Sequence, residues 1–316
     1  MTRQSKIVLE REINPFVPFF NMSIPSALSE ALRELPSYLR PAPLFVFNEE
    51  HEGVMGESRV TEMLEKIKAN GFGGAYIHPR PGMITEYLSP RWFELVRHTV
   101  RECRRLGLVP HLYDENSYPS GFAGGHVVAQ APDCRSRYFL PVYGRGPANL
   151  PTDALSVYRW TGELPGDRIP ASGVSVGTDW IAFVLRDLES KPFLADGSYV
   201  SLVDPLSTAT FLTLTHARYR AELGDDDWRA LGSIFTDEPH LPGSDLGAWS
   251  PGLHGSHWVL SSFHRECGYD LRDRIADLYY ESPTASATRY DFYNLLHRMW
   301  MVSVARSTPL FFEGLV

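Results

Sequence analysis

The feature that most constrains the fold is an alternation of short apolar runs and amphipathic segments between residues 43 and 113. The apolar runs at 43–48, 73–78 and 108–113 are short enough to be strands buried on both faces. Residues 58–71 place Val60, Met63, Leu64 and Ile67 at helical spacing, and 89–107 begins with a serine–proline pair and ends at a glycine. Strands and helices that alternate with short connections predict right-handed β/α units and a parallel sheet.

This alternation is interrupted after Asn116. About 90 residues separate Asn116 from the next expected helix, which is too long for a plain loop. The interruption contains four runs of β-type composition, separated by turns rich in glycine and proline, at 138–143, 155–160, 180–186 and 199–203. We therefore expect a β-rich insertion over residues 122–203, which either shapes a substrate cleft or is a packing ornament.

The alternation then resumes with an expected helix at 207–223 and a fourth strand at 233–236. A loop at 242–255 precedes three further helices, expected at 256–267, 271–280 and 285–306. Residues 1–42 form a lead-in with one helix near 26–35, and residues 43–121 and 204–316 form the β/α portion. Four β/α units are half of a (β/α)₈ TIM barrel, which takes about 250 residues. The predicted fold is an incomplete TIM-type barrel, present as a fragment, an open sheet or one half of an assembly.

Composition excludes some partner classes. The net charge is 30 − 38 = −8, which argues against nucleic acid and against an acidic membrane surface. Cys103, Cys134 and Cys267 are far apart and odd in number, so neither a disulfide framework nor a zinc site is expected. The sequence shows neither a signal peptide nor a membrane span, which predicts a cytoplasmic protein.

Each predicted strand is followed by polar side chains of catalytic type. Because the carboxyl ends of parallel strands meet at one edge of a sheet, we expect these side chains to form a site. In chain order they are Asn48, Glu49, Glu50 and His51 after the first strand; His78 and Arg80 after the second; Tyr113, Asp114, Glu115 and Asn116 at the third; and Asp237, Glu238 and His240 after the fourth.

Each of these groups also has a simpler interpretation. Asp114, Glu115 and the Asp237–Glu238 pair are all placed to cap turns, and the acids near Glu49 fit a solvated loop. His78 and His111 fit core histidines, and for His111 in mid-strand we favour that interpretation. Arg80 lies between two prolines, which stiffen the backbone and favour a role in holding a carboxylate or a ligand.

Aromatic residues accompany the strand ends. Tyr87, Trp92, Tyr118 and Phe122 surround the second and third, and flat aromatic faces stack on sugar rings. Trp92 also fits the apolar stripe of its helix. Residues 118–125 form a glycine-rich aromatic loop, which lacks the lysine and the spacing of a phosphate-binding loop.

Four segments of the chain resemble glycoside hydrolases of the α-L-rhamnosidase type (family 106): residues 73–82, 87–96, 112–125 and 236–240. The resemblance implies a (β/α)₈ catalytic domain in a larger multidomain protein, with two carboxylates flanking the glycosidic bond. Thr236–His240 is also similar to the motif that ends the fourth strand in many retaining barrel glycosidases. That similarity implies that Glu238 is the proton donor and that Asp237 and His240 orient it.

The resemblance further implies that the remaining strand-end residues bind a carbohydrate. These are Asn48, Glu49, His78, Arg80, Tyr113, Asp114, Glu115 and Tyr118, with His240. The resemblance implies no required cofactor. Members of this family are associated with calcium, for which Asp114 and Glu115 are candidate ligands here. The second catalytic carboxylate of such enzymes comes from a later strand, which this sequence does not contain. The missing remainder of the barrel or a second copy of the chain is therefore the expected partner.

Two other hypotheses remain open. The first is a metal-dependent sugar isomerase or epimerase, with Asp114, Glu115, Asp237, Glu238 and His240 as ligands. The second is a non-catalytic carbohydrate-binding protein. Stoichiometric bound metal would favour the first, and sugar binding without turnover would favour the second.

Overall fold

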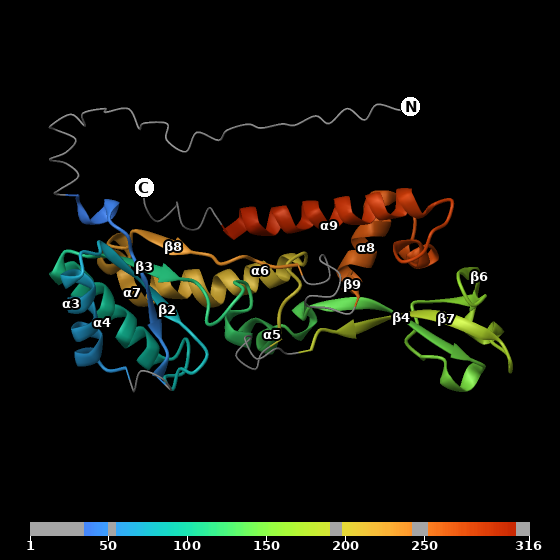
Figure 1. Cartoon of the computed structure of the whole chain (residues 1–316), viewed down its shortest axis with the longest axis horizontal. Coiled ribbons are helices and arrows are strands. Elements are labelled where there is room, and N and C mark those ends of the chain that lie inside the picture. The colour runs from blue at the N-terminus through green and yellow to red at the C-terminus, as the bar shows by residue number, and fades with distance from the viewer. Residues whose placement is uncertain (1–34, 50–54, 190–197, 242–251, 308–316) are drawn as a thin grey trace, which may run out of the picture.

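In a computed structural model, described for residues 35–49, 55–189, 198–241 and 252–307, the chain folds around two separate sheets (Figure 1). The first is parallel, with strand order β1-β2-β3-β8. Its strands are β1 (Leu44–Phe47), β2 (Gly74–Pro79), β3 (Val109–Tyr113) and β8 (Ser233–Phe235). All four predicted strands are present, and each pairs in parallel as the β/α alternation requires.

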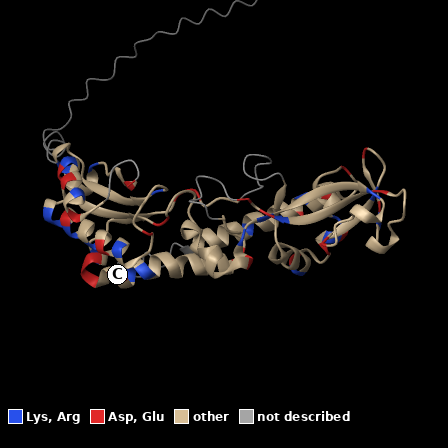
Figure 2. Ribbon diagram, turned by 90° about the horizontal axis from the view of Figure 1, so that it is seen from below, with Lys and Arg blue, Asp and Glu red and all other residues tan. Residues whose placement is uncertain are grey.

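The first two helices between these strands begin and end within two residues of the predicted positions. They are α3 (Glu57–Ala69) and α4 (Pro90–Leu106). The Ser89 side chain caps α4 by accepting a hydrogen bond from the Trp92 N–H at 3.2 Å. Gly107 ends α4 with φ 70°, a left-handed conformation that glycine adopts without steric cost. Lysine, arginine, aspartate and glutamate are interspersed on these two helices (Figure 2).

The parallel sheet is open. Among the described residues it has four strands, with β1 and β8 at its edges, and no closed barrel is formed. Leu44 on β1 and Phe235 on β8 are 45% and 40% exposed. The expected TIM-type barrel is therefore not confirmed: the four strands and the helices between them form an open sheet, because four strands cannot curve far enough to meet.

The second sheet is antiparallel, with strand order β6-β5-β7-β4-β9. Its strands are β4 (Arg137–Arg145), β5 (Ser156–Trp160), β6 (Pro165–Ile169), β7 (Asp179–Asp187) and β9 (Leu253–Gly255). Three of the four predicted β runs are strands. The fourth, at 199–203, makes only a single bridge, between Val200 and Arg135. The strand β9 was predicted to be loop and lies beyond the expected insertion, yet it pairs with β4.

The helix predicted at 207–223 continues further than expected. It comprises α6 (Pro205–Leu212), a π-helical turn (Thr213–Ala217) and α7 (Arg218–Arg229). The later helices are α8 (His257–Cys267) and α9 (Ala285–Ser307), as predicted. Residues 271–280, predicted to be one helix, instead contain two 3₁₀ turns, η8 (Leu271–Asp273) and η9 (Ile275–Leu278). The expected helix near 26–35 lies almost entirely outside the described residues.

Short helical turns complete the described parts. They are η1 (Ser37–Leu39), η2 (Ala123–Gly125), α5 (His126–Gln130), η3 (Pro132–Cys134), η4 (Pro147–Asn149) and η5 (Ala171–Gly173). None of the described helices is both long enough and apolar enough to span a membrane.

Two large apolar cores hold the sheets. One packs α3, α4 and α7 against the parallel sheet and includes Trp92 and Phe93, and the other packs α8 and α9 against the antiparallel sheet around Phe139 and Phe292. Trp300 of α9 packs against both cores. The helix α9 therefore runs alongside both parts of the molecule, with its C-terminal end toward the parallel sheet (Figure 1).

Candidate active site

The strand register brings the predicted site residues to one edge of the parallel sheet. Val46 pairs with His78, and Tyr113 pairs with Phe235, so the residues that follow these strands leave the sheet side by side. The ladder continues one residue further, where the Asp114 N–H donates to the Phe235 carbonyl at 3.1 Å.

Asp114 connects the loop after β3 to the end of β8. Its side chain is 1% exposed and accepts hydrogen bonds from Ser120 Oγ at 2.6 Å and Thr236 Oγ1 at 2.7 Å. His216 Nε2 lies 3.6 Å from the Asp114 carboxylate. Burial raises the pKa of Asp114, and His216 and the two hydroxyl groups oppose this rise. Asp114 is therefore an internal acceptor that joins two strand ends.

Ser120 positions Asp237. Its Oγ accepts a hydrogen bond from the Asp237 N–H at 2.8 Å, and its own N–H donates to the Asp237 carbonyl at 2.8 Å. The Asp237 carboxylate accepts a hydrogen bond from the Tyr113 hydroxyl at 2.6 Å. Asp237 is thus held by β3 and the loop that follows it. Ser120, Thr236 and His216 were not among the predicted site residues. Thr236 and His216 contact Asp114, and Ser120 contacts Asp237, across segments that are far apart in the chain.

Tyr199 connects the last part of the β-rich insertion to this edge. Its buried hydroxyl donates to the Ser120 carbonyl at 2.8 Å and accepts from the His240 N–H at 2.9 Å. Tyr199 therefore holds together the loop after β3 and the loop after β8. The sequence placed it in a strand of the insertion, where nothing indicated a contact with the site.

Replacing Tyr199 by phenylalanine removes both hydrogen bonds and keeps the ring. We expect the free energy of unfolding in urea to fall by about 1–3 kcal/mol, because a buried carbonyl loses its partner. Tyr158→Phe is the control. The Tyr158 hydroxyl donates to the Asp273 carbonyl at 3.1 Å, and Tyr158 belongs to the antiparallel sheet rather than to the parallel one. Equal chemical-shift changes at His240 in both variants would contradict the proposed contact between the loops.

The Glu115 carboxylate organises the glycine-rich loop. It is fully buried and accepts hydrogen bonds from five backbone N–H groups, those of Asn116 and of residues 121–124, at 2.6–3.1 Å. Burial raises its pKa to about 8, with a further contribution from the Asp114 charge, and the backbone N–H groups oppose this rise. Glu115 was expected to bind a substrate. Both of its oxygens instead face the backbone N–H groups inside the loop, so they are not available to a substrate.

Glu49 has a similar structural role. It is 3% exposed and accepts hydrogen bonds from the Met55 N–H at 2.9 Å, the Ile84 N–H at 2.5 Å, and both the N–H and the hydroxyl of Thr85. Burial acts to raise the pKa of Glu49, but these hydrogen bonds outweigh it and lower the pKa. Glu49 therefore belongs neither to a solvated acidic loop nor to a ligand-facing surface. Glu50, His51 and Glu52 lie outside the described residues.

Glu49 predicts a pH-dependent contribution to stability. Its folded-state pKa lies below the ordinary 4.5, so its contribution is complete above pH 4.5 and is lost as the pH falls through the lowered value. We expect wild type to exceed Glu49→Gln by about 1–3 kcal/mol in free energy of unfolding at pH 7, and the difference to shrink below pH 4. A difference that stays constant from pH 7 to pH 3 would contradict this assignment.

His78 and Asn48 lie at the ends of adjacent strands. His78 is fully buried, its ring centroid lies 3.7 Å from that of Tyr113, and neither ring nitrogen has a hydrogen-bond partner among the described residues. Burial, with a smaller effect from Arg80, lowers the pKa of His78 to about 3, so the ring is neutral. Asn48 is half-buried, and its Oδ1 also lacks a hydrogen bond in the described structure.

His111 has a structural role, as favoured from the sequence. Its Nδ1 and the Ser233 hydroxyl form a hydrogen bond at 2.8 Å, and its ring stacks on Tyr76.

Glu238 is the exposed carboxylate at this edge. It accepts a hydrogen bond from the hydroxyl of half-buried Tyr118, and that bond is the largest cause that raises the pKa of Tyr118 to about 12. Arg80 is partly exposed, and in the described parts of the chain no ion pair joins it to an acid. Glu238 and Arg80 are therefore groups that a ligand could reach.

Backbone strain marks the same two loops. Four non-glycine residues of the described chain have positive φ, and three of them are Ser117, Ala123 and Glu238, with φ of 93°, 51° and 37°. Such conformations cost about 1–2 kcal/mol each and are concentrated at functional sites. The loops that hold Glu238 and Tyr118 are thus strained, which supports a functional interpretation of this edge.

The two calcium candidates do not fit a calcium site. The Asp114 oxygens accept hydrogen bonds from two hydroxyl groups, and the Glu115 oxygens face backbone N–H groups. Calcium requires six to eight oxygen ligands that converge on one point. In the described parts of the chain, no group of three or more histidine, cysteine, aspartate or glutamate side chains is arranged to hold a metal.

Comparison with known proteins adds one structural relationship. No protein-family model matches the sequence, and no curated protein matches it. Among solved structures, the fold is similar to that of a rhamnosidase from Novosphingobium sp. PP1Y, with a TM-score of 0.58 and 12% sequence identity. The match covers 92% of this chain and 46% of that chain. The likeness shows the fold alone. The chain spans less than half the length of that rhamnosidase.

Proposed function

We propose that the chain is a glycoside hydrolase module in which Glu238 is the general acid. The observation that carries this proposal is the exposed Glu238 carboxylate, held by Tyr118 in a strained turn at the carboxyl edge of the parallel sheet. Beneath it, the Asp114–Ser120–Asp237 hydrogen bonds keep that turn in place. A carboxyl group fixed at a strand end can protonate a glycosidic oxygen without rearranging the fold.

A saccharide is the proposed substrate, and an α-L-rhamnoside is the first candidate to test. The rhamnosidase named above supports this choice through its fold. Arg80 and Asn48 supply a guanidinium group and a side-chain amide at the same edge, and both can bond sugar hydroxyl groups. His78 is fully buried, so it would contact a ligand only after a rearrangement.

A partner is part of the proposal. Glycoside hydrolysis uses two carboxyl groups, and the other described acids at this edge are engaged: Glu49, Asp114 and Glu115 are buried, and Asp237 is bonded to Tyr113. We propose that the second carboxylate comes from the remainder of a barrel or from a second copy of the chain. The exposed edge of β8 could pair with a further parallel strand of either partner.

The direct test is turnover. The full chain is incubated with 4-nitrophenyl α-L-rhamnopyranoside and with the corresponding glucoside, galactoside and mannoside, and release of 4-nitrophenol is followed. Release with one of these supports the hydrolase. Calorimetric binding of the glycosides without release would instead support the carbohydrate-binding hypothesis, and stoichiometric metal in elemental analysis would support the isomerase.

A further inference from the structure

A pocket begins at the residue directly after Glu238. Its volume is about 500 Å³, which lies within the range of small-molecule sites. One wall is formed by residues 239–241 of the loop after β8. The other wall is formed by α9, with the side chains of Tyr293, Leu296, His297 and Trp300.

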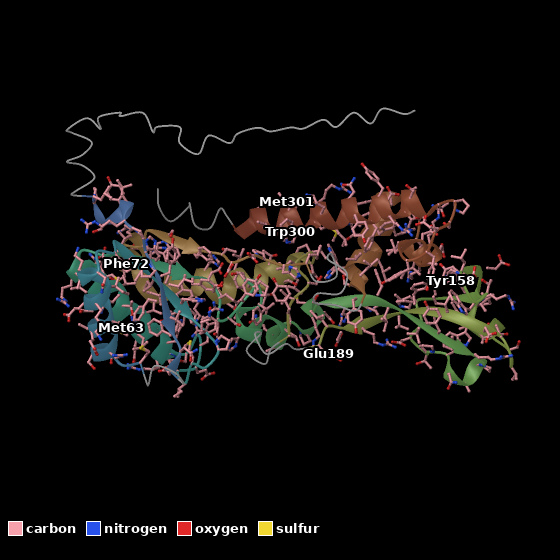
Figure 3. All side chains as sticks on the ribbon, viewed as in Figure 1. Met63, Phe72, Tyr158, Glu189, Trp300 and Met301 are labelled. Atoms are coloured by element: carbon pink, nitrogen blue, oxygen red, sulfur yellow. The ribbon has the colours of Figure 1, made fainter. Side chains whose placement is uncertain are left out.

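A hydrogen bond ties the two walls together. The Trp300 indole N–H donates to the Pro239 carbonyl at 3.1 Å, and Trp300 packs against both apolar cores. Trp300 is labelled on α9 in Figure 3. Trp300 therefore keeps the C-terminal part of α9 next to the turn that carries Glu238. The two segments are far apart in the sequence, so this contact places the pocket beside the proposed acid.

The lining indicates the class of ligand. The described lining residues supply the aromatic rings of Tyr293 and Trp300, two imidazole side chains and two leucines, and none of these described residues is an aspartate, glutamate, lysine or arginine. Tyr293 is 40% exposed, and the His297 ring lies 6.2 Å from the Trp300 ring at an angle of 44°. A neutral sugar ring suits such a pocket, because its C–H face packs on aromatic rings and its hydroxyl groups bond to imidazole nitrogens.

We propose that this pocket binds the pyranose ring on the leaving-group side of the glycosidic bond. The inference rests on the proposed function: a general acid protonates the oxygen of the leaving group, so the ring that carries this oxygen lies beside Glu238. The substrate is then a glycoside whose leaving group is itself a sugar.

The test measures binding, which does not depend on turnover. Glu238→Gln is titrated with D-glucose, D-galactose, D-mannose and L-rhamnose, and binding is followed by saturation-transfer NMR. We expect at least one of these sugars to bind. Adding Tyr293→Ala or His297→Ala should weaken its affinity by about 2- to 10-fold through the lost ring contacts. The matched control is Tyr290→Ala on the same helix, whose side chain is 69% exposed and outside the pocket lining.

Several outcomes would overturn the pocket assignment. They are binding by none of the four sugars, unchanged affinity in both pocket variants, or equal weakening by Tyr290→Ala. The two proposals fail separately. If Glu238→Gln abolishes turnover but the pocket variants bind normally, the pocket is wrong and the hydrolase stands. If the pocket variants lose binding but wild type has no activity, the sugar site stands without its leaving-group role.

Discussion

Replacing Glu238 by glutamine is expected to lower kcat on an aryl glycoside by about 10²- to 10⁴-fold, the usual contribution of a positioned general acid. Glutamine keeps the size of the side chain and its hydrogen bond with Tyr118, but it has no proton to transfer. Because Glu238 is exposed, the fold should be unaffected. Steady-state kinetics and thermal unfolding of the same preparation measure both effects.

Two comparisons sharpen this test. Glu163→Gln changes an exposed glutamate between β5 and β6 and should leave kcat unchanged. A substrate with a better leaving group, such as a 2,4-dinitrophenyl glycoside, needs less protonation and should recover much of the lost rate in Glu238→Gln. An unchanged kcat in Glu238→Gln would remove Glu238 from the proposed role. If kcat fell equally for good and poor leaving groups, Glu238 would have a role other than proton donation.

Replacing Glu115 by alanine is expected to lower the free energy of unfolding by about 3 kcal/mol or more, because several buried donors lose their acceptor together. Among the described residues, the five backbone N–H groups that donate to Glu115 have no other acceptor. Urea unfolding measures the loss. Hydrogen exchange should be fastest at residues 121–124, since their amides are released from Glu115.

The control for Glu115 is Glu163→Ala, which should change stability by less than about 0.5 kcal/mol because Glu163 is exposed. Glu115→Gln is a stricter variant. Its amide offers one oxygen and one NH₂ group where two acceptor oxygens are needed, so it should also destabilise the protein. If Glu115→Ala were as stable as wild type, the carboxylate would not be the centre of this loop.

The parallel part of the fold could be predicted from local patterns. Apolar runs of strand length and a helix with Ser89 at its start and Gly107 at its end describe structure that neighbouring residues decide. The rule that parallel strands end at one edge then brought His78, Tyr113 and Asp237 together, and the register agrees with it. Closure of the strands into a barrel depends on contacts between strands far apart in the chain, so no local pattern could predict it.

The direction of each side chain could not be predicted in the same way. Glu49, Glu115 and Glu238 all follow strands as acids, yet two are buried acceptors and one is exposed. The difference depends on how each loop folds back, and for Glu115 it depends on backbone N–H groups that any residue except proline would supply. The types of residue in the sequence therefore do not indicate these hydrogen bonds.

The sequence by itself determined the four parallel strands, the helices between them and the set of polar residues at the strand ends, because strand and helix periodicity are local properties. Only the tertiary structure decided which of those residues face a ligand. Tyr199, Asp114 and Trp300 reach partners that lie 41 to 122 residues away in the chain. Such contacts form only when the whole chain is packed, and they hold Glu238 and the pocket beside it in place.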